Sequence, residues 1–117
     1  MIIKGKRIEG KKLGRELGFP TVNLRYDGKE TGVFAGFATI EDAGNPLLAA
    51  VNIGNDKLCE IHLIDWEGVV KKNTEVSLEL KKKVREEMHF AGLDELKSQI
   101  AKDVAKIKHW YENGELI

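Results

Sequence analysis

Residues 47–66 read LLAAVNIGNDKLCEIHLIDW, and this stretch decides the fold class. It contains two runs rich in apolar and β-branched residues, 47–53 and 59–66, which are typical of strands. A Gly-Asn-Asp sequence separates the two runs, and tight turns favour these residue types. In the second run apolar residues alternate with Glu60 and His62, so the polar pair faces away from the apolar side of a sheet. The stretch therefore predicts two strands joined by a short turn.

Strand character extends in both directions from this pair. Residues 32–40, GVFAGFATI, are rich in aromatic and β-branched side chains, and residues 75–80, EVSLEL, alternate strictly. Residues 42–46, DAGNP, have the composition of a turn. Successive strands joined by short turns indicate an antiparallel sheet, and closure into a barrel would remove its exposed edges.

The last third of the chain has a different period. Apolar residues there recur every three or four positions, which is the pattern of an amphipathic helix. Gly92 is an acceptable N-cap, and the pair Asn113-Gly114 should end the helix. We expect this helix to pack on the outside of the barrel or across one end. The apolar positions are Leu93, Leu96, Ile100, Val104, Ile107 and Tyr111.

Composition limits the classes of function. The 117 residues are 42% hydrophobic and 32% charged, which indicates one globular domain over residues 1–117. Basic and acidic residues number 19 each, so the net charge is zero and we expect neither nucleic-acid nor membrane binding. The single Cys59 cannot form an internal disulfide, and the N-terminus lacks the apolar core of a signal peptide. We therefore expect a cytoplasmic protein, and separately we expect a monomer.

Residues 10–24, GKKLGRELGFPTVNL, combine glycines, basic side chains and two neutral oxygen ligands. Glycine lets a backbone approach a ligand closely, and cations with exposed N–H groups suit phosphate. Thr21 and Asn23 lie two residues apart, as suits a hard cation such as Mg²⁺. Two interpretations fit this stretch: a nucleotide-phosphate site, or a turn-rich hairpin with a solvated basic face.

Other candidate residues also have two interpretations. Glu60 is either a general base or an exposed strand residue, and the sequence by itself favours the second. His62 has no second metal ligand near it in sequence and is typical of a surface or hydrogen-bonded core residue. The basic run 81–85 is typical of a solvated strand end or connector. Trp66, Trp110 and Tyr111 could stack on a planar ring, although such aromatics belong more often to a core.

These segments, in this order, resemble the riboflavin kinase (flavokinase) family, and the resemblance covers nearly the whole chain. The most specific part is the sequence Gly-Arg-x-Leu-Gly-x-Pro-Thr-x-Asn, which occurs here as residues 14–23 after Gly10. The other matching segments are individually less specific, but their order is that of the family. They are residues 32–36 (GVFAG), residues 51–54 (VNIG), residues 60–66 (EIHLIDW), and Arg85, Glu87 and Phe90 ahead of the helix.

The resemblance implies a role for each matching position. Residues that would bind the nucleotide are Gly10, Lys11, Lys12, Gly14, Arg15, Gly18, Pro20, Thr21 and Asn23. Of these, Thr21 and Asn23 would also contact Mg²⁺. Glu60 would be the catalytic base that takes the proton of the ribityl 5′-hydroxyl. The flavin pocket would involve Arg85, Glu87, Phe90 and Leu93.

The implied fold is a mainly β, six-stranded antiparallel Greek-key barrel with a C-terminal α-helix packed on it. The implied activity is that of a monofunctional riboflavin kinase, with Mg²⁺-dependent transfer of the ATP γ-phosphate to riboflavin to give FMN and ADP. We expect no adenylyltransferase half in this chain, so it should make FMN but should not convert FMN to FAD. One departure leaves an alternative open. The family usually has Asn-Pro-Thr and several more residues before the glutamate, whereas only residues 55–59 intervene here. The alternative is a non-catalytic flavin- or nucleotide-binding module on the same barrel.

Overall fold

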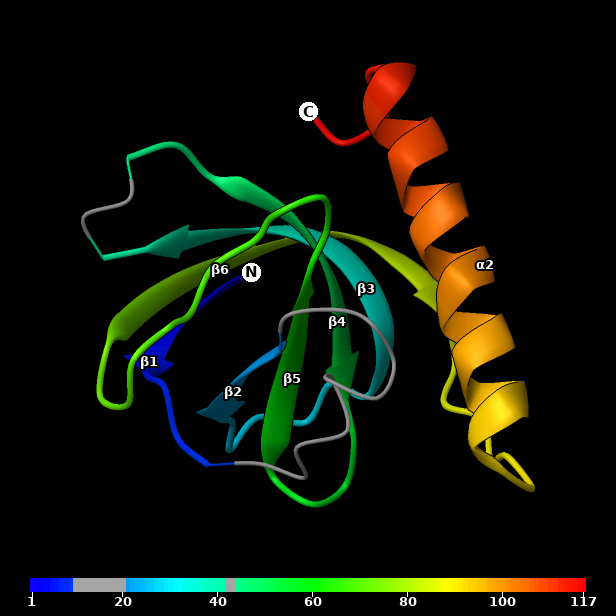
Figure 1. The fold of residues 1–117 in the computed structure, drawn as a ribbon, viewed down its shortest axis with the longest axis horizontal. Coiled ribbons are helices and arrows are strands. Elements are labelled where there is room, and N and C mark those ends of the chain that lie inside the picture. The colour runs from blue at the N-terminus through cyan, green and yellow to red at the C-terminus, as the bar shows by residue number, and fades with distance from the viewer. Residues whose placement is uncertain (10–20, 42–43) are drawn as a thin grey trace.

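A computed structural model describes residues 1–9, 21–41 and 44–117 of the chain. In that part of the chain, six strands precede one long helix (Figure 1). The strands are β1 (Ile2–Lys6), β2 (Thr21–Arg25), β3 (Gly32–Ile40), β4 (Leu47–Ile53), β5 (Leu58–Leu63) and β6 (Glu75–Arg85), and the helix is α2 (Leu93–Glu112).

The strands form one antiparallel sheet in the order β1-β6-β3-β4-β5-β2. Strands β3, β4 and β5 are neighbours in sequence and in space, and β6 returns to lie beside β3, which is a Greek-key arrangement. The two edge strands approach each other at a seam, where the Ile8 amide donates to the Asn23 carbonyl at 2.9 Å. The predicted six-stranded antiparallel barrel is confirmed, and this bridge nearly closes it.

The strong curvature of the barrel depends on β3 and β6. Their register shifts twice, between Val33 and Phe34 and between Ala35 and Gly36. Such β-bulges bend a strand and increase its twist. A side chain at Gly36 would put its Cβ 2.5 Å from the carbonyl oxygen of Glu79, so only glycine fits this close approach of two backbones.

The main core fills the barrel interior. Because strand side chains alternate, every second residue of each strand points inward and is removed from water. Fully buried residues of this cluster include Leu24 of β2, Ile53 of β4, Ile61 and Leu63 of β5, and Leu78 of β6. The inward orientation predicted for the apolar residues of β5 and β6 is therefore confirmed.

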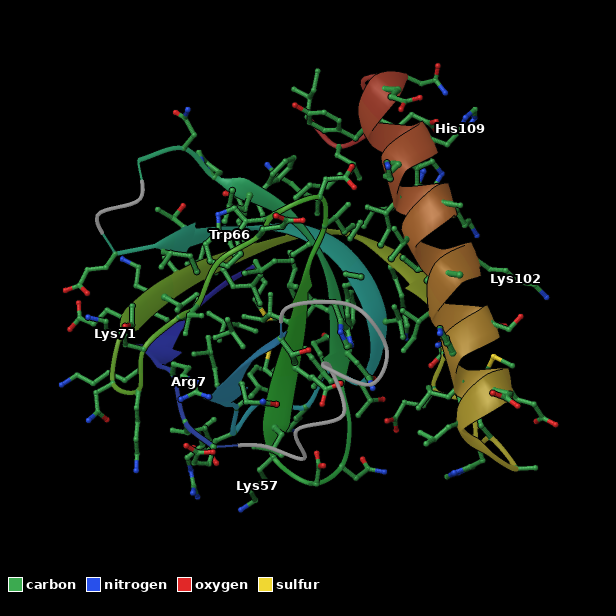
Figure 2. All side chains as sticks on the ribbon, viewed as in Figure 1. Arg7, Lys57, Trp66, Lys71, Lys102 and His109 are labelled. Atoms are coloured by element: carbon green, nitrogen blue, oxygen red, sulfur yellow. The ribbon has the colours of Figure 1, made fainter. Side chains whose placement is uncertain are left out.

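A second, smaller core joins the helix to the outside of the barrel (Figure 1). Ala35 and Ala50 are cross-strand partners on the outer face of β3 and β4, and both are buried. Their small side chains let Ile100, Val104 and Ile107 of α2 pack closely on the sheet. Figure 2 shows Lys102 and His109 on the opposite side of the helix, pointing away from the strands.

Helix α2 agrees with its sequence pattern except at Leu93, which is 49% exposed, and near its end. It starts after the N-cap Gly92, and Asn113 is its C-cap, as expected. Tyr111, predicted to face the core, is 55% exposed, whereas Trp110 is buried. The inward stripe advances by three residues from Ile107 rather than by four, because a 3.6-residue period must alternate between the two steps.

Two strand ends also differ from the sequence expectation. Strand β5 ends at Leu63 rather than at residue 66, because the chain turns at Asp65, which has a φ of 53°. Strand β6 continues through the basic run to Arg85. Lys81 and Lys83 are exposed and pair with Glu79 and Glu86, so the expectation of a solvated strand end is confirmed.

An ion pair fastens the end of β6 to the middle of α2. The Arg85 Nε donates to both carboxylate oxygens of Asp103 at 3.1 Å, and Nη2 donates to Oδ2 at 2.9 Å. Gln99 Nε2 donates to the same carboxylate at 3.0 Å. Asp103 is only 4% exposed, so this pair is a buried, multiply bonded link between barrel and helix.

Replacing Asp103 by Ala should lower the free energy of unfolding by about 3 kcal/mol, since the variant leaves a partly buried guanidinium without its carboxylate. Urea denaturation of both proteins measures the loss. The matched control is Asp94→Ala, an exposed acid in the first turn of the same helix, which should cost less than about 1 kcal/mol. Equal losses in the two variants would contradict this account of the pair.

The single cysteine lies in the barrel core. Cys59 is fully buried between core side chains of β5 and its neighbours. Burial, with a smaller contribution from the adjacent Glu60 carboxylate, raises the pKa of the Cys59 thiol to about 12. The folded protein therefore keeps this proton at pH values where the unfolded chain loses it.

Because the pKa of Cys59 is higher in the folded state, its stabilising effect is complete below about pH 9 and disappears as the pH rises toward 12. Between pH 8 and 10.5 the thiol should reduce the free energy of unfolding by about 2 kcal/mol. Denaturation of the wild type and of Cys59→Ala at both pH values isolates the contribution of the thiol to the free energy of unfolding. A parallel pH dependence in the two proteins would contradict it.

Candidate active site

Polar side chains gather on the outer face of β2, β4 and β5, opposite the barrel core. Thr21 of β2 is the cross-strand partner of His62, and Asn23 is the partner of Glu60. On the other side of β5, Asn52 of β4 is also a partner of Glu60. Because residues two apart share a face of a strand, these five side chains form one polar surface. Residues from distant parts of the sequence thus meet around Glu60.

Asn23 lacks a hydrogen bond that its burial would normally require. The residue is 6% exposed, and its side-chain oxygen Oδ1 is buried without a hydrogen-bond partner in the part of the chain that the structure describes. An unsatisfied buried oxygen is destabilising, and native proteins rarely keep one without a reason. Binding a cation is such a reason, since amide oxygens are ligands for hard divalent ions.

Glu60 and its neighbours are connected by hydrogen-bonding distances. The carboxylate oxygen Oε1 lies 3.1 Å from His62 Nε2, and the side chain of Glu60 is 20% exposed. On the opposite edge of the imidazole ring, Nδ1 lies 3.4 Å from Thr21 Oγ1. His62 itself is 4% exposed. The carboxylate therefore sits at the border between the buried imidazole and solvent.

A pocket lies between this polar surface and the start of helix α2. The volume of the pocket is about 110 Å³. One of its walls is formed by the sheet and includes Glu60, His62 and Asn52. The opposite wall comes from the end of β6, from the connector 86–92 and from α2. The residues on that side are Arg85, Glu87, Met88, Phe90, Leu96, Ile100 and Asp103. The pocket thus combines carboxylates with apolar and aromatic side chains, as small-molecule sites do.

The structure brings together some of the residues singled out in the sequence. Thr21, Asn23 and Glu60 are adjacent, and Arg85, Glu87 and Phe90 line the pocket next to Glu60. Leu93, the first residue of α2, is 49% exposed and is not among the described residues that line this pocket. The remaining nucleotide-site candidates lie outside the described residues. They are Gly10, Lys11, Lys12, Gly14, Arg15, Gly18 and Pro20.

Sequence reasoning gave too little weight to two buried polar residues. His62 was expected to be a surface or hydrogen-bonded core residue, and it is the buried link between Glu60 and Thr21. Asp103 interrupts the apolar stripe of α2 at a buried position, which is a signal in itself, because an unpaired carboxylate is not tolerated there. Its partner Arg85 is 18 residues away in sequence, so the spacing could not identify it.

The residues present suit a hard cation held by neutral oxygens. The unsatisfied Asn23 Oδ1 and the Thr21 hydroxyl lie on the same face of β2, because the two residues are two positions apart in the strand. Among the described residues, no three His, Cys, Asp or Glu side chains are grouped as a metal site would need. Mg²⁺ fits this donor set because it prefers oxygen and takes few protein ligands when phosphates complete its coordination.

Comparison with known proteins agrees with this architecture. The sequence profile of the flavokinase family, described as riboflavin kinase, matches residues 1–111. Among similar proteins, a bifunctional riboflavin kinase/FMN adenylyltransferase of Escherichia coli (strain K12) is 33% identical over 93% of this chain and 37% of its own length. The RNA-binding riboflavin kinase RibR of Bacillus subtilis (strain 168) is 34% identical over 95% of this chain and 51% of its own length.

A solved structure shows the same fold. The riboflavin kinase from Trypanosoma brucei superposes with a TM-score of 0.66 at 20% identity, over 98% of this chain and 82% of that protein. The fold class is therefore an antiparallel β-barrel with one helix packed on its outside. Within that class, the chain belongs to the riboflavin kinase (flavokinase) family. It spans only about a third to a half of the length of the two relatives named above.

The expected absence of nucleic-acid and membrane partners remains a prediction. The Bacillus subtilis relative is named as RNA-binding, but this name applies to that protein and does not by itself assign RNA binding to this chain. In the described part of the chain, no helix has both the length and the apolar composition needed to cross a bilayer.

Replacing Asn23 by Leu should leave the free energy of unfolding unchanged or raise it by about 1 kcal/mol, because the change removes an unsatisfied buried oxygen and keeps the same branched side-chain shape. The matched variant is Thr21→Val on the same strand, which should lose about 1 kcal/mol with its hydroxyl contact to His62. Urea denaturation without added metal compares them. A clear loss in the Asn23 variant would contradict the assignment of an unsatisfied oxygen.

Proposed function

We propose that this chain is a riboflavin kinase that transfers the γ-phosphate of ATP to the 5′-hydroxyl of riboflavin, giving FMN and ADP. One observation carries the proposal. Thr21, Asn23 and Glu60 share one face at the pairing of β2 with β5, directly beside the pocket under helix α2. A pair of neutral oxygen ligands next to a carboxylate suits phosphoryl transfer, which depends on positioning and charge neutralisation. The likeness of the chain to riboflavin kinases supports the choice of acceptor.

Each group would have a distinct role in the reaction. Thr21 and Asn23 would hold Mg²⁺, which would neutralise charge on the phosphate oxygens. The Glu60 carboxylate would accept the proton of the ribityl 5′-hydroxyl while its oxygen bonds to the γ-phosphorus. The bond between the γ-phosphorus and the bridging oxygen breaks in the same transfer, and ADP leaves with that oxygen.

The pocket next to Glu60 is the proposed flavin site. Phe90 offers an aromatic face, and Arg85 and Glu87 offer polar groups at the opposite wall. At about 110 Å³ the pocket is smaller than sites for drug-sized ligands, which are about 300 Å³ or more. The connector 86–92 is mostly exposed and forms one wall, so we expect it to move outward when flavin enters.

The short turn between β4 and β5 motivates the alternative function. The turn bends at Lys57, which has a φ of 61°, and Asp56 Oδ1 accepts the amide of Leu58 at 3.2 Å. Figure 2 shows Lys57 projecting from this turn at the edge of the barrel. A longer segment at this point would add a wall beside Glu60. If the wall is essential, the chain would bind flavin or nucleotide without transferring phosphate.

Purified protein with riboflavin, ATP and Mg²⁺ should form FMN, and Glu60→Gln should lower kcat by about 100-fold or more, because the amide cannot accept the proton. Chromatographic detection of FMN gives the rate, and quenching of flavin fluorescence gives binding. The control is Glu75→Gln, an exposed carboxylate on β6, which should keep full activity. Flavin binding without FMN would favour the binding module, and equal rates in Glu60→Gln and wild type would refute the role of Glu60.

A further inference from the structure

His62 is the only buried histidine among the residues that the structure describes, and it lies next to Glu60 on the polar surface. Its cross-strand neighbours are Thr21 of β2 and Ala50 of β4, and it also lines the pocket. The small side chain of Ala50 leaves room for the imidazole ring on one side. A buried imidazole needs partners for both ring nitrogens, and this histidine has a candidate for each.

The two contacts determine which ring nitrogen has the hydrogen. Nε2 lies 3.1 Å from Glu60 Oε1, and an ionised carboxylate can only accept a hydrogen bond. Nε2 must therefore donate, which leaves Nδ1 of the neutral ring as an acceptor. Nδ1 lies 3.4 Å from Thr21 Oγ1, so the threonine hydroxyl donates to it. This assignment follows from the chemistry of the partners on both sides of the ring.

We propose that His62 is a positioning residue, which holds the Glu60 carboxylate and the Thr21 hydroxyl in one fixed orientation. The inference rests on the proposed function for its catalytic consequence and on the two ring contacts for its structural part. One neutral ring connects the proposed base to a proposed cation ligand 39 positions earlier in the sequence. The two halves of the site are thereby coupled through a single side chain.

Fixing Glu60 matters because the side chain is long and borders solvent. A glutamate has three rotatable bonds, and ordering them has an entropic cost that reduces the population in the reactive orientation. The bond from His62 holds Oε1, which restricts the rotation of the carboxylate and leaves its other oxygen to accept a proton in the proposed reaction. Displacement of a reacting group by about 1 Å can slow a reaction by about 100-fold.

The hydroxyl of Thr21 is oriented by the same ring. When Oγ1 donates its hydrogen to Nδ1, its lone pairs are directed to the other side of the oxygen. A cation needs lone pairs rather than the hydrogen, so this orientation is the one that suits Mg²⁺. His62 would therefore orient both Glu60, the proposed base for the acceptor hydroxyl, and Thr21, the proposed ligand of the cation at the phosphates.

Kinetics of three His62 variants test the catalytic consequence. His62→Ala should lower kcat by about 10-fold to 100-fold with a change in the riboflavin KM below about 3-fold, because orientation and not binding is lost. His62→Gln should recover at least part of the loss, since its amide nitrogen reaches about as far as Nε2. His62→Asn has a shorter amide and should not recover it. Equal kcat in the Gln and Ala variants would overturn the proposal.

A double variant separates positioning from a general structural effect. The part of the His62 effect that passes through Glu60 should vanish in Glu60→Gln, so adding His62→Ala to that variant should lower kcat by clearly less than it lowers the kcat of the wild type, the remainder being the contribution of Thr21. A fully additive loss would show that His62 does not act through Glu60 and would overturn the proposal. The matched control is His109→Gln, on the side of α2 that points away from the strands (Figure 2), and it should keep wild-type kinetics.

Nitrogen-15 NMR of the histidine rings tests the contacts without any turnover. At pH 8 the wild type should show His62 with hydrogen on Nε2, and Glu60→Gln should shift this resonance more than Glu75→Gln does. Hydrogen on Nδ1 in the wild type would overturn the proposal whatever the activity. Absence of FMN formation with the Nε2 tautomer present would instead refute the proposed function and leave the structural link between His62 and Glu60 supported.

Discussion

The antiparallel pairing of β2 with β5 is the constraint on which the site depends. It sets Thr21 opposite His62 and Asn23 opposite Glu60, and in doing so it also sets Val22 opposite Ile61 in the core. A slip of one residue would exchange the two faces of the strand and bury the polar residues in the barrel. The hydrophobic interior therefore enforces the register of the polar surface, because only one alignment satisfies both. The chemistry on the outside of the barrel is positioned by the packing inside it.

The two walls of the pocket differ in how deeply their residues are buried. On the sheet wall, Glu60 is flanked along β5 by the fully buried Cys59 and Ile61, whose packing resists movement. On the opposite wall, most side chains of the connector 86–92 are exposed. Arg85 and Asp103 mark the boundary, since their ion pair fixes the end of β6 to α2. In the proposed function, substrate would therefore enter by movement of the connector without disturbing the carboxylate.

The sequence predicted the features that follow from the repeating pattern of apolar residues along a single strand or helix. The alternation of Glu60 and His62 with apolar residues placed the two kinds of side chain on opposite faces, because a strand has a period of two. The apolar stripe of α2 likewise predicted the burial of Val104 and Ile107. The prediction was wrong at Tyr111, near the end of the helix. The local pattern does not decide whether the next buried residue comes three or four positions after Ile107. From the residues themselves only four strands were evident, and the count of six came from the family resemblance.

Features that depend on distant residues could not be derived from spacing. Nothing in the local pattern says that Asn23 pairs with Glu60 or that Arg85 meets Asp103, since the fold decides both. The seam between β1 and β2 has one further consequence. The backbone of Asn23 accepts the Ile8 amide that nearly closes the barrel, while its side chain belongs to the polar surface. One residue thus takes part both in closing the barrel and in forming the polar surface, so a substitution that opens the seam would also disturb the site.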